Sequence, residues 1–138
     1  MVEAQAANTC NFTNVTNVSF GSYDTLSAGN VDSTGSLTID CSAAWTTVTT
    51  SIGPSPNSGG FTPRDMKLTT GTDLLNYNLY TTASRNIIWG DGTQGTSTVV
   101  QSIQKNHPWT GTFYGRIPGS QDVSIGNYSE VLLITISF

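Results

Sequence analysis

The chain offers few side chains that are suited to catalysis. Its only histidine, His107, stands in the segment "KNHPWTG", where proline, asparagine and glycine indicate a turn, and no serine or cysteine motif accompanies it. Paired carboxylates can act as general acid and base, but the carboxylates of this chain are dispersed, with no close pair in the sequence. They include Asp24, Asp40, Asp65, Asp91, Asp122 and Glu130. We therefore expect a protein that is not an enzyme.

Two cysteines, Cys10 and Cys41, are the other reactive side chains. Together with a single distant histidine they fall short of the four ligands of a structural zinc site. A disulfide between them suits a protein of an oxidising compartment. Closing that loop contributes about 3–4 kcal/mol in the chain-entropy model. We expect one Cys10–Cys41 disulfide, no metal and no cofactor.

Three short patterns resemble ligand or modification sites. The segment "WGDG" at residues 89–92 is typical of a hairpin turn with Asp-Gly at its tip, and we favour this interpretation over calcium binding. The segment "GPSPNSGG" is not a phosphate loop, because it lacks the Lys-Ser/Thr ending and a following helix. Asn11, Asn14, Asn17 and Asn127 match the N-glycosylation pattern, which arises readily by composition in a chain rich in Asn and Thr.

Composition and charge narrow the class of protein further. Charged residues make up 10% of the chain, and its net charge of −4 comes without a cluster of Lys and Arg that would neutralise phosphates. We therefore expect no nucleic-acid partner, and no stretch approaches the roughly 18 apolar residues of a membrane span. We interpret the cations as solubilising charges: Arg64, Lys67, Arg85, Lys105 and Arg116.

Short strand patterns separated by turn residues must position whatever site exists. Thr-rich segments favour strands, while Gly, Pro, Asn and Ser mark the turns between them. This spacing predicts one all-β domain over residues 1–138, folded as an antiparallel Ig-like sandwich. The expected strands are residues 12–20, 36–41, 46–52, 66–70, 74–82, 86–89, 97–103, 111–117 and 129–138.

The last expected strand contains "EVLLITISF", the clearest strand pattern of the chain. Leu132, Ile134, Ile136 and Phe138 occupy alternate positions, which predicts a strand with one buried face. Such a strand requires partners along its edges. The sequence ends with this segment, so the identity of its neighbours becomes the central question.

Seven elements taken together resemble the spore coat protein U domain family, which includes the subunits of archaic chaperone–usher pili. They are, in order, "CNF" with "VSFGSYD", then Cys41, "PRDMKL", "LNYNLY", "WGDG", "FYGRIPGSQ" and "GNYSEVLLITISF". The resemblance covers residues 10–138. No single element is decisive, and their order along the chain carries the resemblance.

This resemblance implies an Ig-like sandwich that lacks its last strand. Pilus subunits of this kind look like Ig domains whose groove is filled by a strand from a periplasmic chaperone and later by one from a neighbouring subunit. Neighbouring subunits, the chaperone and an outer-membrane usher are therefore the implied partners of a protein secreted through the periplasm to the cell surface. The implied groove residues are Leu132, Ile134, Ile136 and Phe138 on the last strand, with Phe12, Val15 and Val18 on the opposite wall.

The opposite wall contains an inconsistency of parity. Phe12 and Val18 lie an even number of residues apart, whereas Val15 has the other parity. A regular strand would point Val15 away from the face that holds the other two side chains. Either a β-bulge lies between them or one of the three does not belong to the groove.

The start of the chain departs from the family pattern. A donor strand needs bulky apolar side chains at alternate positions, whereas Val2, Ala4 and Ala6 are the alternating residues before Cys10. The segment Ala4-Gln5-Ala6 also matches the end of a secretory signal. Residues 1–9 are thus interpreted as a truncated donor strand or a signal remnant. Alternatively, the chain is a tip domain that donates no strand, or it forms a coat by another linkage.

Aromatic residues in predicted loops are candidates for a binding surface. Phe61 in "SGGFTPRD" and Trp109 in "KNHPWTG" are flanked by turn residues. Tip subunits of the family resemble domains with apolar loops that adhere to abiotic or host surfaces, and an exposed apolar patch fits that use. The alternative is that both rings fold back onto the ends of the sandwich. Trp45 and Trp89 are expected in the core or beside the disulfide.

Three functions are compatible with these features. The leading hypothesis is a structural or adhesive subunit of an extracellular archaic chaperone–usher pilus, assembled by donor-strand complementation and serving cell adhesion and biofilm formation. The second is a free-standing secreted module that binds carbohydrate or surfaces. The third is a structural protein of a spore coat, which the family name suggests.

Overall fold

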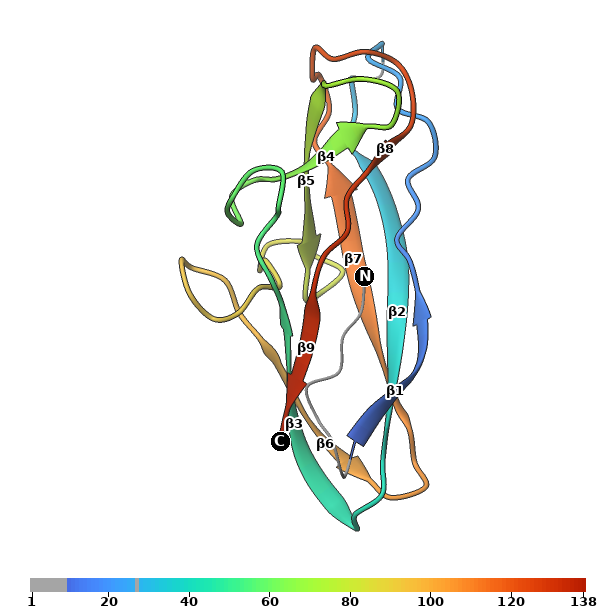
Figure 1. Ribbon diagram of the computed structural model, residues 1–138, viewed down its shortest axis with the longest axis vertical. Helices are drawn as coiled ribbons and strands as arrows, with labels where there is room; N and C mark the ends of the chain where they lie inside the picture. The colour runs from blue at the N-terminus through green and yellow to red at the C-terminus, as the bar shows by residue number, and fades with distance from the viewer. Residues whose placement is uncertain (1–9, 27) are drawn as a thin grey trace.

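Two antiparallel sheets carry the strand pattern of this chain. The computed structural model describes residues 10–26 and 28–138, and all its regular elements in these ranges are strands. The larger sheet has the order β1 (Cys10–Thr16), β2 (Val31–Cys41), β7 (Trp109–Ile117), β5 (Leu74–Tyr80), β4 (Arg64–Leu68) and β8 (Tyr128–Ser129) (Figure 1). The smaller sheet has the order β6 (Val99–Gln104), β3 (Trp45–Ile52) and β9 (Ile134–Ser137). Residues 1–9, interpreted above as a donor strand or signal remnant, lie outside the described ranges.

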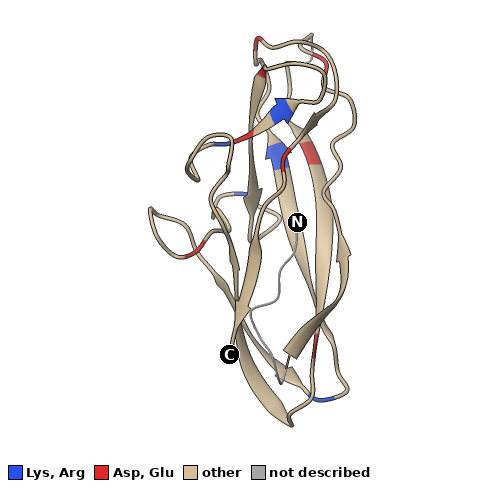
Figure 2. Ribbon diagram, viewed as in Figure 1, with Lys and Arg blue, Asp and Glu red and all other residues tan. Residues whose placement is uncertain are grey.

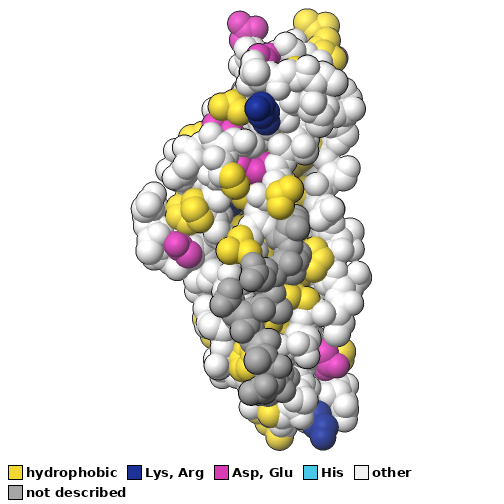
Figure 3. All heavy atoms as spheres, in the orientation of Figure 1, with side chains coloured by type: hydrophobic (Ala, Val, Ile, Leu, Met, Phe, Trp, Pro, Cys, Tyr) yellow, Lys and Arg dark blue, Asp and Glu magenta, His cyan; other side chains and the backbone are white. Residues whose placement is uncertain are grey.

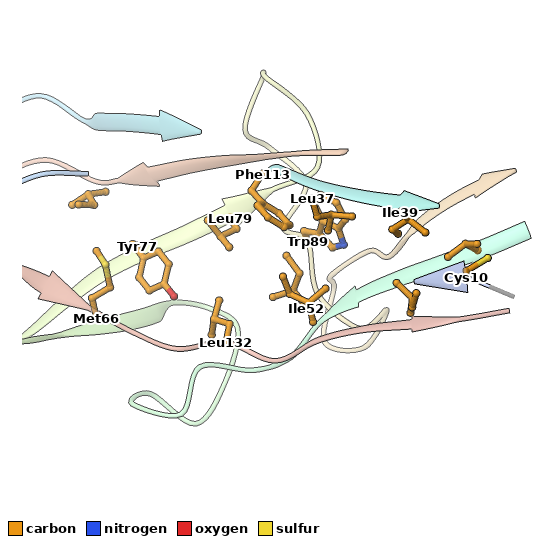
Figure 4. Close-up of a cluster of buried hydrophobic side chains, with 14 of the residues drawn as sticks. Cys10, Leu37, Ile39, Ile52, Met66, Tyr77, Leu79, Trp89, Phe113 and Leu132 are labelled. Atoms are coloured by element: carbon orange, nitrogen blue, oxygen red, sulfur yellow. The ribbon is translucent and has the colours of Figure 1, made fainter. Parts of the chain in front are cut away.

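The core lies between the two sheets because every second side chain of each long strand points inward. Leu37 and Ile39 of β2 are fully buried, and so is Ile52 of β3 in the other sheet. The rings of Trp89 and Phe113 meet across the core with centroids 5.2 Å apart (Figure 4). The predicted all-β, Ig-like sandwich is confirmed.

A disulfide joins the first two strands. Cys10 and Cys41 face each other as paired residues of β1 and β2, and their sulfur atoms are bonded. Both residues are buried in the core. The predicted Cys10–Cys41 disulfide is confirmed, and it fixes β1 to the rest of the larger sheet.

Two predicted strands differ from the structure in kind, and two others differ mainly in their bounds, because 12–20 ends at Thr16 in β1 and 36–41 begins at Val31 in β2. Residues 86–89 form only isolated bridges, in which Ile88 lies opposite Tyr80 and Trp89 opposite Ser97. The predicted strand 129–138 is divided into β8 in the larger sheet and β9 in the smaller one. Residues 130–133 cross from one layer to the other, so they cannot pair with either sheet over their whole length (Figure 1). Side-chain alternation does not reveal such a crossing, because the buried face is continuous.

The two tryptophans expected in the core or beside the disulfide have different environments. Trp89 is 1% exposed and donates its indole N–H to the carbonyl of Thr50 at 3.0 Å. Trp45, at the start of β3, is 64% exposed and therefore does not lie in the core. Its place in the strand explains the difference, because Trp45 has the parity of Thr47 rather than that of the buried Val48.

No helix in the described ranges is long and apolar enough to cross a membrane.

Candidate functional site

A pocket opens over the inner face of the larger sheet, at the end that holds β4 and β8. Its volume is about 380 Å³, and its apolar wall includes Val18, Phe20, Met66, Phe113 and Leu132. One side consists of the segment 17–21, which follows β1, and the other consists of the segment 127–132, which leads into β9. The segment that follows β1 and the segment that leads into β9 therefore flank the same opening. Apolar side chains also reach the surface along this face of the molecule (Figure 3).

The strand β9 has one edge to which no other described strand is paired. Gly53 donates its N–H to the carbonyl of Leu133 at 2.9 Å, just before β9 begins. The alternation of an antiparallel ladder therefore points the N–H and C=O groups of Ile134 and Ile136 away from β3. Ile52, which lies opposite Ile134, shows the same alternation. Its N–H donates to the carbonyl of Gly90 and its carbonyl accepts from Arg64, so neither group bonds to β9.

The strand β1 is the end strand of the larger sheet, and it contains the bulge that parity requires. Phe12 lies opposite Ile39 and Val15 lies opposite Leu37, with a register shift between Phe12 and Asn14. The extra residue turns Phe12 and Val15 to the same side of the sheet. Both pack against the core, as does Val18 beyond the end of the strand. The bulge is therefore the correct one of the two alternatives.

The residues predicted for the last strand are not equally buried. Leu132, Ile134 and Ile136 are 3%, 0% and 0% exposed, and all three belong to the core. Phe138 is 47% exposed, because it follows Ser137, the last residue of β9 that is paired with β3. The period-2 pattern thus identifies the inward face of the segment correctly, but Phe138 does not share its burial.

A glutamate closes one wall of the pocket. Glu130 lies between β8 and β9, and its carboxylate accepts a hydrogen bond from the Tyr77 hydroxyl at 2.6 Å. The other carboxylate oxygen accepts the Ser55 hydroxyl and the backbone N–H of Asn57, the latter at 3.1 Å. Burial and this hydrogen bond to Glu130 raise the pKa of Tyr77 far above its ordinary value. Tyr77 is therefore a permanent donor that fixes the crossing segment to β5.

Comparison with known proteins identifies the family of this chain. The model of the Spore Coat Protein U domain matches residues 1–135. This chain belongs to that family. Protein U of Myxococcus xanthus is 35% identical over 130 residues, which cover 88% of this chain and 71% of Protein U. The resemblance that the order of the seven motifs indicated is confirmed.

This spore coat protein U domain contains a buried arginine beside the pocket wall. The Arg64 guanidinium is 0% exposed and donates to the Asn78 side-chain oxygen at 3.0 Å. It also donates to the backbone carbonyls of Ile52, Gly53 and Trp89, at 3.2, 2.9 and 2.8 Å. Burial lowers the pKa of Arg64 to about 10. The interpretation of Arg64 as a solubilising charge is wrong, because this side chain connects β4, β5, the end of β3 and the first residue of the "WGDG" segment.

A second carboxyl group, Asp65, lies next to this network. Its Oδ1 is buried without a hydrogen-bond partner. Burial and the nearby charge of Glu130 raise the pKa of the Asp65 carboxyl. Sequence reasoning missed the cluster of Arg64, Tyr77 and Glu130, because its members are far apart along the chain and have no spacing of their own. The only signal was that "PRDMKL", "LNYNLY" and the last motif belong to the family resemblance.

The two aromatic residues proposed for an adhesive loop are not free. Phe61 is 2% exposed, and the Arg64 guanidinium lies 5.2 Å from the centre of its ring. Trp109 is the first residue of β7, pairs with Ile39 and packs partly buried against the core. Both side chains therefore follow the alternative in which they close the sandwich. The adhesive-loop hypothesis is not supported at these positions, because turn residues beside an aromatic do not establish that its ring is exposed.

The remaining candidate sites show ordinary loop contacts. Gly90 and Ser97 close a wide loop around "WGDG", and Asp91 accepts the backbone N–H of Thr93 at 2.9 Å. Trp89 and Ser97 form a parallel bridge, so the predicted tight hairpin is wrong. His107 lies exposed in a turn, where its backbone N–H donates to the backbone carbonyl of Gln104 at 3.0 Å. Within the described ranges, no three side chains are arranged to hold a metal ion.

Proposed function

We propose that this protein is a non-catalytic subunit of an extracellular fibre or coat, assembled when a strand from another polypeptide adds to β9. The observation that carries this proposal is the pairing of β9 on one edge only within the described ranges, next to an apolar pocket bordered by the segment that leads into β9 and by the segment that follows β1. An extended strand added to a sheet edge gains main-chain hydrogen bonds, and its alternate side chains can enter pockets. Membership of the spore coat protein U family supports an assembly role at the cell surface.

The energetics favour occupation of the opening. Burial of one large apolar side chain contributes roughly 1.5–3 kcal/mol, so two or three inserted side chains rival a substantial part of the stability of a domain. An unpaired strand edge beside apolar surface is also prone to aggregation. A chaperone that supplies a strand before assembly, and an usher that receives the subunit, are consistent partners in this proposal. The disulfide agrees with passage through an oxidising compartment.

The family description names a spore coat, and the same strand addition serves a coat or a pilus. In both cases the adhesive or structural unit is the polymer rather than the single domain. Our proposal therefore concerns the linkage between subunits. It assigns cell adhesion and biofilm formation to the assembled fibre.

Backbone amide exchange measured by NMR tests the linkage at single residues. A synthetic peptide of about twelve residues, in which Ile and Thr alternate, is added to the oxidised protein. We expect the amides of Ile134 and Ile136 to become protected, because they face the open edge of β9. Those of Thr135 and Ser137 face β3 and should be protected with or without the peptide. The matched control is a peptide of the same composition with its Ile residues adjacent. Unchanged exchange at Ile134 and Ile136 at saturating peptide would contradict the proposal.

A further inference from the structure

The outer face of the smaller sheet is covered by short hydroxyl side chains. Thr47, Thr49 and Ser51 of β3 alternate with buried residues and therefore point outward. Across the sheet, Thr49 lies opposite Ser137 of β9, and Thr47 lies opposite Ser102 of β6. The backbone positions that carry these hydroxyls are spaced by about 4.8 Å across strands and about 6.7 Å along them. The result is a regular array of groups that each donate and accept hydrogen bonds.

This hydroxyl face carries no charge. None of the residues of β3, β6 and β9 is Asp, Glu, Lys or Arg (Figure 2). The outer face of the larger sheet is different, because Asp32 of β2 and Arg116 of β7 form an ion pair there at 2.7 Å. The two outer faces therefore offer different chemistry, although both contain threonines.

An exposed aromatic ring stands at one end of the hydroxyl face. Trp45 has the parity of Thr47 and Thr49, and its side chain is 64% exposed. Val100, opposite Thr49 on β6, is 58% exposed. A large exposed tryptophan is unusual on a secreted domain unless it contacts something, because its ring carries a considerable area of apolar surface.

We propose that this face binds a neutral polysaccharide, with Trp45 beneath a sugar ring and the Thr/Ser array against the sugar hydroxyls. The Thr and Ser hydroxyls can donate hydrogen bonds to the sugar hydroxyls and accept hydrogen bonds from them, because each hydroxyl is both a donor and an acceptor. A charged polymer would have to lose hydration without gaining a countercharge. A second copy of the same face is a poor occupant, because homodimer interfaces have a largely apolar core and this face has only a few apolar side chains. The proposal does not depend on strand exchange, because one copy carries the whole face.

Co-sedimentation with microcrystalline cellulose and with chitin powder tests this assignment. We expect the oxidised wild-type protein to be retained on at least one of the two, and to stay retained in 0.5 M salt at about the same level, because neutral contacts are not screened. Thr49→Glu and Thr47→Glu should weaken retention about tenfold, because a buried carboxylate lacks a partner in the complex. Trp45→Ala should weaken it roughly two- to tenfold.

The matched control is Thr112→Glu, which places the same charge on the outer face of the larger sheet. Thr112 is half-buried like Thr49 and lies in a central strand of its sheet. Retention of this variant should stay within about twofold of the wild type, with size-exclusion chromatography and urea unfolding used to check that each variant is folded. If the wild type binds neither powder, the proposal is overturned. Equal loss in Thr112→Glu and in the variants at Thr47 and Thr49 would also overturn it.

Discussion

At the scale of the residue, Arg64 shows how a charged side chain becomes a structural link. Three of its hydrogen bonds go to backbone carbonyls that no strand ladder satisfies, and one goes to Asn78. A guanidinium can serve several acceptors at once, because its donors form a rigid planar fork. Methionine or lysine could fill a similar volume, but neither could serve all four acceptors.

Replacement of this arginine should therefore be costly. We expect Arg64→Met to lower the free energy of unfolding by about 3–5 kcal/mol, because it leaves buried carbonyl oxygens without donors. Urea unfolding of the oxidised protein measures the loss. Arg116→Met is the matched control, since its exposed pair with Asp32 should contribute little. Equal effects of the two variants would contradict the role given to Arg64.

Asp65 makes the opposite contribution at neutral pH. Burial raises the pKa of its carboxyl above 3.8, so the folded protein binds this proton more tightly than the unfolded chain does. The folded state accordingly loses stability as pH rises through the raised pKa. We expect Asp65→Asn to be more stable than the wild type at pH 7, and the difference to shrink towards zero below pH 3.8. Urea titrations at several pH values give the difference, and a gain that is independent of pH would count against burial of the charge as its cause.

At the scale of the element, the bulge in β1 explains a sequence feature that alternation alone could not resolve. Without Thr13, Phe12 and Val15 would be paired with Ile39 and Leu37 in an uninterrupted register. The extra residue is accommodated because β1 is an end strand, where no second described strand restricts it. Parity in the sequence indicated either a bulge or a wrong residue, and only the register of β1 on β2 decided between them.

This register leads to an unusual expectation for a deletion in a strand. Removal of Thr13 should leave Phe12 and Val15 facing the core, so the variant should fold and form its disulfide, with only a small shift in the urea midpoint. Deletion of Thr112 from the regular strand β7 should instead turn one half of that strand inside out and prevent folding. Soluble yield and near-UV circular dichroism distinguish the two results. A deletion of Thr13 that unfolds the protein would show that the bulge itself is required.

The other elements show where sequence patterns succeed and where they fail. β3 was predicted within one residue, at 46–52 against Trp45–Ile52, because its alternation ends at a Gly-Pro turn. The predicted final strand was divided, because a continuous apolar face does not report which sheet supplies the pairing. The burial of Leu132, Ile134 and Ile136 followed from the period-2 pattern alone. The network of Glu130, Tyr77 and Arg64 did not, because it depends on contacts between distant segments.

At the scale of the whole molecule, the sandwich is held together unevenly. Among the described residues, the larger sheet has six strands and the smaller one has three, so the core beside β9 depends on few described neighbours. The disulfide fixes β1 at one end of the core, and the Glu130 cluster fixes the crossing segment 130–133 at the other. The pocket bordered by the segments 17–21 and 127–132 lies at the second of these two fixed points, because Glu130 is one of its lining residues. A strand added to β9 would therefore connect the region of the disulfide with that of the Glu130 cluster, both of which the molecule already holds in place.

This arrangement predicts that the melting temperature depends on the concentration of a strand-forming peptide. A ligand that binds only the folded state at about 100 times its dissociation constant stabilises that state by about 2.7 kcal/mol. For a chain of 138 residues this corresponds to a rise of roughly 8–13 °C. We expect the alternating Ile/Thr peptide to produce such a rise, increasing with the logarithm of its concentration, in thermal unfolding of the oxidised protein. The peptide of the same composition with adjacent Ile residues cannot present one apolar face to the pocket, so it should leave the melting temperature unchanged. Equal rises with both peptides would indicate nonspecific apolar binding, and no rise with either would mean that the domain is already complete.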